Sequence, residues 1–146
     1  MTVRALLCAW LILGTSCARN DVGYADGTGA RYDDWKGRWV LVNYWAEWCA
    51  PCRQEIPELN ALYRDRAGEV LVVGVNFDGV KGVALTDLMA RMAIEFPVVL
   101  TDPRERWQYD RPSVLPTTVV IDPSGNVVGV RVGPQTRESL EEALTP

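Results

Sequence analysis

Residues 40–57 read VLVNYWAEWCAPCRQEIP, and this stretch decides the fold. Residues 40–45 are apolar or aromatic apart from one asparagine, which predicts a buried strand. After a three-residue link come Cys49 and Cys52, and then a run of helix-forming residues. Pro51, between the cysteines, suits a first helical turn, where its missing N–H has no intrahelical partner. The stretch therefore predicts a strand, a short turn and a helix that begins at the cysteines.

The position of the two cysteines favours redox chemistry. Unpaired N–H groups and the helix dipole at the helix N-terminus favour a thiolate at Cys49. Cys52 lies one turn later on the same face, within the Cα separation of about 4.4–6.8 Å that a disulfide needs. The alternatives are a structural disulfide or half of a zinc site. Zinc needs four ligands, and the chain has no histidine and no second cysteine pair of this kind, so we predict no metal.

The motif Trp48-Cys49-Ala50-Pro51-Cys52-Arg53 resembles the active site of the thioredoxin superfamily. The longer run over residues 35–59, WKGRWVLVNYWAEWCAPCRQEIPEL, resembles the membrane-anchored, extracytoplasmic branch typified by TlpA, ResA and CcmG (DsbE). This resemblance implies an α/β thioredoxin fold, with a central mixed β-sheet flanked by helices on both faces. It covers most of the chain, from residue 35 to the C-terminus.

The rest of the chain has periodicities that fit such a fold. Residues 70–75 read VLVVGV, a continuous apolar run typical of a parallel strand covered on both faces. The other predicted elements are a helix from Cys49 to Asp65 kinked at Pro57, a helix over 83–96, a short strand over 97–100, an edge strand over 127–132 and a last helix over 137–144 capped by Thr136. For the polar segment 101–113, the resemblance implies a short helix.

Residues 114–122 read VLPTTVVID and form the second signature. Proteins of this family place a cis-proline before a strand that faces the two cysteines, and Pro116 takes that position. The resemblance implies that the Leu115 backbone pairs with the extended chain of a substrate. The alternative is an ordinary proline that starts a strand. Together with Trp48 and Pro51, Leu115 and Pro116 are the predicted substrate contacts; simple packing is the alternative for Trp48.

Cys52 must lose its proton before it attacks, and burial opposes that loss. Cytoplasmic thioredoxins carry a buried aspartate on the preceding strand, where this chain has Asn43, which does not titrate. Glu55 lies one turn beyond Cys52 on the same helical face, as in the TlpA, ResA and CcmG group. We therefore predict that Glu55, with its pKa raised by burial, accepts the Cys52 proton directly or through water, and that it is catalytic together with Cys49 and Cys52. The alternative is a solvated carboxylate on the helix surface.

Composition sets further bounds on the function. The chain has 146 residues, of which 48% are hydrophobic, enough for one domain with a single core. Its net charge of −4 argues against nucleic acid as a partner. The other two cysteines, Cys8 and Cys17, precede the predicted domain, so no scaffold of several disulfides is expected. We predict no cofactor beyond the Cys49–Cys52 disulfide.

The N-terminus has the layout of a secretory signal. One arginine precedes an apolar run over residues 5–13, too short to span a bilayer comfortably, and small residues follow. The sequence ending at Cys17 resembles a relaxed bacterial lipobox, which implies lipid on Cys17. The alternatives are cleavage after Ala18, which releases a soluble protein, and an uncleaved anchor. We predict a signal over 1–17, a flexible tether over 18–34 and a domain over 35–146.

Together these features predict an extracytoplasmic, periplasmic thiol–disulfide oxidoreductase that works as a reductant. The resemblance implies oxidised exported proteins as substrates, such as an apocytochrome c in cytochrome c biogenesis, and a membrane electron donor of the DsbD or CcdA kind. A disulfide-donating oxidase or an isomerase is an alternative, since the same mechanism runs in either direction. Related peroxidases need a Thr-x-x-Cys signature, which is absent. An alternative of another class is a non-catalytic, tethered binding domain.

Overall fold

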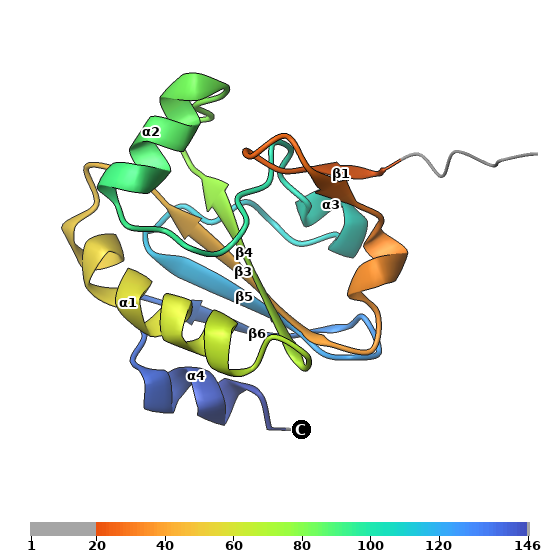
Figure 1. Cartoon of the computed structure of the whole chain (residues 1–146). Helices are drawn as coiled ribbons and strands as arrows, with labels where there is room; N and C mark the ends of the chain where they lie inside the picture. The colour runs from red at the N-terminus through yellow and green to blue at the C-terminus, as the bar shows by residue number, and fades with distance from the viewer. Residues whose placement is uncertain (1–19, 146) are drawn as a thin grey trace, which may run out of the picture.

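The computed structural model describes residues 20–145, so the predicted signal, Cys8 and Cys17 lie outside the described part (Figure 1). In chain order the elements are β1 (Val22–Gly23), β2 (Gly29–Ala30), the 3-10 helix η1 (Tyr32–Trp35), β3 (Trp39–Trp45), α1 (Ala50–Asp65), β4 (Val70–Asn76), α2 (Val83–Arg91), α3 (Arg104–Trp107), β5 (Thr117–Ile121), β6 (Val127–Val132) and α4 (Arg137–Ala143).

Four strands form the central sheet in the order β4-β3-β5-β6. β3 pairs in parallel with β4, whereas the β3–β5 and β5–β6 pairs are antiparallel. The predicted mixed sheet is therefore confirmed. Because β3 and β4 are parallel, their carboxyl ends lie at the same end of the sheet, where α1 begins (Figure 1).

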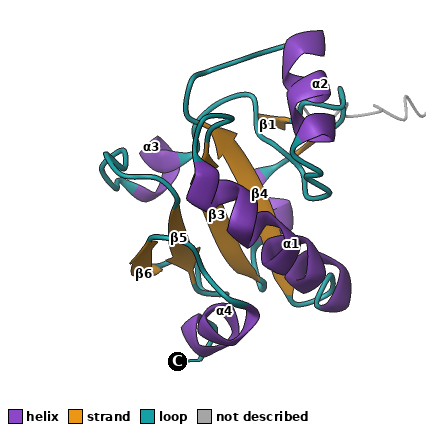
Figure 2. Ribbon diagram, turned by 90° about the vertical axis from the view of Figure 1, so that its left-hand side faces the viewer, coloured by secondary structure: helices purple, strands orange, loops and turns teal. Residues whose placement is uncertain are grey.

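Side-chain alternation along β3 divides the core between the two faces of the sheet. Leu41 and Trp45 belong to the cluster formed with α1, α2 and α4. Val40, Val42 and Tyr44 belong to the opposite cluster, which η1 and the α3 region cover. Figure 2 shows α1 crossing in front of β3 and β4. Helical elements on both faces confirm the predicted thioredoxin fold.

The N-terminal part of the described chain corrects the prediction of a flexible tether over residues 18–34. Residues 20–34 do not form a free tether, because β1 and β2 pair as an antiparallel hairpin. Tyr24 bridges to Val99, and Val22 is only 3% exposed. Trp35, the last residue of η1, is 2% exposed and stacks on Trp107, with ring centroids 5.8 Å apart. Burial of these few apolar side chains holds a glycine-rich segment against the sheet.

The region after β4 differs from the prediction in helix length. α2 ends at Arg91 rather than continuing to residue 96, and Ala93 takes a positive φ of 54°. The Asn60 side chain explains the end, because its amide donates to the Ala93 carbonyl at 2.7 Å and accepts from the Glu95 N–H at 3.0 Å. Residues 97–100 form isolated bridges, including Gly74 with Val98, instead of a strand.

The first and last helices follow the sequence prediction closely. α1 spans Ala50–Asp65 and contains Pro57, and Cys49 is its N-cap residue. The Thr136 hydroxyl caps α4 by accepting from the Ser139 N–H at 3.2 Å, and α4 packs beside α1. Within residues 20–145, none of the helices has the length and apolarity needed to cross a bilayer.

Candidate active site

Cys49 and Cys52 form a disulfide at the start of α1, with their Cα atoms 5.3 Å apart. Cys49 is 3% exposed and Cys52 is 0% exposed. The Cys52 backbone N–H donates to the Cys49 sulfur at 3.2 Å. After reduction, the same N–H and the helix N-terminus favour a thiolate on Cys49 rather than on the fully buried Cys52. The two sulfurs are therefore chemically unequal.

Glu55 lies one turn further along α1 and is 1% exposed, so it is not a solvated surface carboxylate. One carboxyl oxygen accepts from the Asn43 side-chain amide at 2.6 Å, and the other accepts from the Gln135 backbone N–H at 3.0 Å. Burial raises the pKa of Glu55 from 4.5 to about 7, although both hydrogen bonds lower it. A carboxyl group with this pKa exchanges a proton readily near neutral pH.

Asn43 and its neighbours were not predicted as parts of the site. The Asn43 amide also donates to the Thr118 hydroxyl at 3.0 Å, which joins β3, β5 and α1 through buried polar groups. The signal in the sequence was a single asparagine within an otherwise apolar strand. The Gln135 contact had no such signal, because 80 residues separate it from Glu55.

The Leu115–Pro116 peptide bond is cis in the structure. Pro116 precedes β5, and its carbonyl accepts from the Gly133 N–H at 2.9 Å. Tyr44 of β3 pairs with Thr117. Because the chain continues from Tyr44 towards Cys49 within five residues, the cis bond and the disulfide lie at the same end of the sheet.

Trp48 directly precedes Cys49 and is 66% exposed. Its indole N–H donates to the Asp78 carboxylate at 3.1–3.2 Å, which fixes the ring beside the turn after β4. Val114, next to Leu115, is 53% exposed. Two large apolar groups thus face solvent near the disulfide, whereas Pro51 is half-buried in the first turn of α1.

Among residues 20–145, no three histidine, cysteine, aspartate or glutamate side chains gather as a metal site would require. Cys17, the predicted lipidation site, lies outside the described residues. The groups of the site that can exchange electrons or protons are the two sulfurs and the buried Glu55 carboxyl.

A thioredoxin fold with a cysteine pair at the start of a helix, beside a cis-proline, defines the class of dithiol redox proteins. Residues 20–130 match the AhpC/TSA family, and the chain belongs to it. It is 35% identical to the thiol-disulfide oxidoreductase ResA of Bacillus subtilis over 122 residues, which cover 82% of this chain and 68% of ResA. With its Cys49–Cys52 disulfide, the chain is an enzyme of the thiol–disulfide oxidoreductase class.

Solved structures agree with this assignment. A thiol:disulfide interchange protein of the thioredoxin family from Chlorobium tepidum is 29% identical, with a TM-score of 0.67, covering 87% of this chain and 95% of that one. StoA from Bacillus subtilis has the same fold, with a TM-score of 0.67 at 24% identity, and the match covers 84% of this chain and 92% of StoA.

Proposed function

We propose that this enzyme reduces disulfide bonds in exported proteins, with Cys49 as the attacking sulfur and Cys52 as the resolving one. The buried Glu55, held by Asn43 and Gln135 one turn from Cys52, is the observation that carries the proposal. A purely structural disulfide has no need of a titrating carboxyl sealed beside it. A base at this place serves the step in which Cys52 must ionise.

The reaction has two exchanges. The Cys49 thiolate attacks one sulfur of the substrate disulfide, which forms a mixed disulfide and releases one substrate thiolate. Glu55, ionised, takes the Cys52 proton, and the Cys52 thiolate attacks the Cys49 sulfur. The intramolecular disulfide forms, the second substrate thiolate leaves, and the substrate gains two electrons. The protons for the two substrate thiolates come from Glu55 and solvent.

The substrate chain is held at the surface around the disulfide. Leu115, preceding Pro116, offers backbone groups to an extended peptide, as the resemblance implies. The exposed Trp48 and the half-buried Pro51 complete the contact surface on the side of α1. In this binding mode main-chain hydrogen bonds supply affinity, and pockets for the side chains of the bound chain supply specificity.

A kinetic experiment on Glu55 tests this mechanism. A disulfide-containing peptide is mixed with the reduced enzyme, and the mixed disulfide is counted by mass spectrometry after rapid acid quench. The resolution rate should rise with pH through about 7, where Glu55 ionises. Glu55→Gln should slow resolution about a hundredfold, which is the lower end of what a positioned base contributes, and it should remove the inflection in the pH profile. Glu58→Gln, on the same helix, is the matched control; an unchanged rate in Glu55→Gln contradicts the role.

The direction of electron flow follows from the reduction potential. ResA is named a thiol-disulfide oxidoreductase, a name that leaves the direction open. We propose a reductant supplied by a membrane donor of the DsbD or CcdA kind, with an apocytochrome c among its substrates. Equilibration with a dithiol buffer should give a potential closer to about −270 mV than to about −120 mV, the value of a strong oxidant. A value near the oxidising end favours the oxidase or isomerase instead.

We also propose that the enzyme is extracytoplasmic and anchored by lipid on Cys17. The sequence pattern at residues 1–17 supports this proposal. Metabolic labelling with a fatty acid should mark the wild type and not Cys17→Ala. Equal label on both, or none on the wild type, rejects the lipid anchor without touching the redox chemistry.

A further inference from the structure

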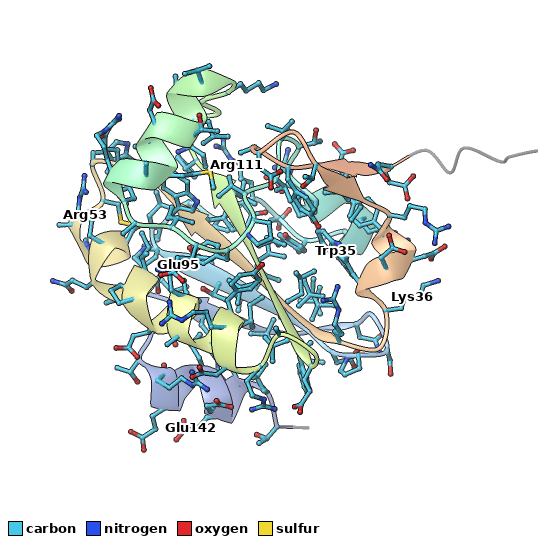
Figure 3. All side chains as sticks on the ribbon, in the orientation of Figure 1. Trp35, Lys36, Arg53, Glu95, Arg111 and Glu142 are labelled. Atoms are coloured by element: carbon cyan, nitrogen blue, oxygen red, sulfur yellow. A yellow bond between two sulfur atoms is a disulfide. The ribbon has the colours of Figure 1, made fainter. Side chains whose placement is uncertain are left out.

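A cavity of about 240 Å³ lies beyond the carboxyl end of β4, separate from the disulfide. We name it the basic pocket, and the residues that matter to its chemistry are Asn76, Phe77, Lys81, Asp102, Arg104 and Arg111. Arg111 lies near the end of β4, at the same end of the molecule as α2 (Figure 3). Lys81, Arg104 and Arg111 take no part in the redox step and lie outside the two hydrophobic clusters.

The charge of the basic pocket is positive. It holds three cationic side chains against the single carboxylate of Asp102. That carboxylate already has partners, since Tyr44 O–H donates to it at 2.7 Å and the Arg104 guanidinium lies 3.8 Å away. Within residues 20–145, Lys81 and Arg111 have no acidic partner within 4.0 Å. Two uncompensated cations in one cleft of a chain with net charge −4 attract an anion.

Asn76, which lines the basic pocket, carries an unpaired hydrogen-bond donor. Asn76 is 8% exposed, and its side-chain carbonyl oxygen accepts from the Val80 N–H at 3.0 Å. Its side-chain nitrogen is buried without any acceptor. An unsatisfied buried amide costs about 1–3 kcal/mol. Asn76 lines the basic pocket, but this nitrogen is closed to solvent, so the attraction for an anion rests on the two cations.

The basic pocket adjoins both loops of the active site. The Phe77 N–H donates to the Trp45 carbonyl at 2.8 Å, and the neighbouring Asp78 accepts from the Trp48 indole. On the other side, the Arg111 guanidinium donates to the Phe77 carbonyl and lies 4.1 Å from the centre of the Phe77 ring. Arg111 precedes Leu115 by four residues. A ligand in the basic pocket is therefore within the reach of a polypeptide seated on the disulfide.

We propose that the basic pocket binds a carboxylate of the disulfide substrate, and that acidic residues flanking the substrate cysteines favour turnover. This inference rests on the proposed function and adds a substrate preference to it. Guanidinium and ammonium groups both donate to carboxylate oxygens. The carboxylate belongs either to an acidic side chain of a protein or to a small thiol such as glutathione.

Two synthetic peptides with the same intramolecular disulfide test the proposal. One carries glutamates beside the cysteines and the other carries glutamines. In wild type the ratio of their kcat/KM values should favour the acidic peptide about tenfold, as expected for steering and binding by two cations. Lys81→Glu should bring the ratio to about one or below, because the added carboxylate repels the ligand. Lys36 is the chain's other lysine and lies outside the basic pocket. The same charge reversal there, Lys36→Glu, should keep the wild-type ratio.

Two further arms of the experiment separate the outcomes. For the wild type alone, rising salt should lower the ratio, since screening weakens contacts between exposed charges. The turnover of glutathione disulfide by wild type and by Lys81→Glu identifies the source of the carboxylate. If Lys81→Glu changes the turnover of glutathione disulfide and not the ratio for the two peptides, the carboxylate belongs to a small thiol. Equal turnover of the two peptides by wild type, together with no Lys81 effect on glutathione disulfide, overturns the basic pocket and leaves the proposed function intact. No turnover of any disulfide refutes the proposed function and this inference with it.

Discussion

Replacing Glu55 by glutamine should change how the stability of the oxidised protein depends on pH. The native state raises the pKa of Glu55 from 4.5 to about 7, chiefly through burial. At about 1.4 kcal/mol for each pKa unit, this difference corresponds to about 3 kcal/mol. The stabilising effect of the protonated group is fully present below about pH 4.5 and is lost as pH rises through about 7, because the folded state binds the proton more tightly than the unfolded state.

Urea denaturation of wild type and Glu55→Gln, both with the disulfide intact, measures this effect. Other titrating groups are common to both proteins, so the difference between their free energies of unfolding isolates Glu55. Relative to Glu55→Gln, the free energy of unfolding of wild type should fall by about 3 kcal/mol as the pH rises from about 4.5 to above about 7. Glu105→Gln, at an exposed glutamate, should follow wild type closely. A difference between wild type and Glu55→Gln that stays constant with pH would refute the reasoning.

Three other substitutions have definite expected outcomes. Asn43→Leu removes a hydrogen bond that lowers the pKa of Glu55. With Asn43→Leu in both proteins, the pH midpoint of the difference in free energy of unfolding caused by Glu55→Gln should therefore move above 7. A midpoint that falls or stays would contradict this. Leu59→Ala, at a 0% exposed position in α1, should lower the free energy of unfolding by about 2–5 kcal/mol in urea titrations, and a loss below about 1 kcal/mol would show a looser core. Thr136→Ala removes the cap of α4 and should cost about 1 kcal/mol, whereas Thr136→Ser should cost less.

The elements that the sequence predicts well are those whose residues share one environment. β3 and β4 are buried along nearly their whole length, so an unbroken apolar run was enough to locate them. α1 was located by the cysteine motif, and α4 by Thr136 and the apolar spacing after it. Short-range signals sufficed because the local preference and the tertiary environment agree.

Elements that depend on distant partners were missed or misjudged. The 22–30 hairpin is rich in glycine and aspartate, and its pairing with residues 98–100 is invisible in its own composition. The end of α2 depends on Asn60, more than thirty residues away in the sequence. Apolar spacing continued past Arg91 because residues such as Phe96 are still buried, although the backbone there is no longer helical.

The candidate site shows the same division. Cys49, Cys52 and Pro116 belong to short motifs, and their placement could be predicted from the sequence together with the family resemblance. The burial of Glu55 is confirmed, but its surroundings could not be predicted, because Asn43, Thr118 and Gln135 come from other parts of the fold. The basic pocket had no sequence signal at all, since its cations come from separate segments: Lys81 between β4 and α2, Arg104 at the start of α3, and Arg111 after α3.

The central claim is that Cys49 attacks a foreign disulfide and Cys52 then displaces the product. Cys52→Ala, reduced and mixed with a disulfide-containing peptide, tests it most directly when the adduct is measured by intact mass. The account predicts a stable mixed disulfide through Cys49 in Cys52→Ala, none in Cys49→Ala, and only a transient one in wild type. Absence of the adduct in Cys52→Ala, or an equal adduct in Cys49→Ala, would contradict the account.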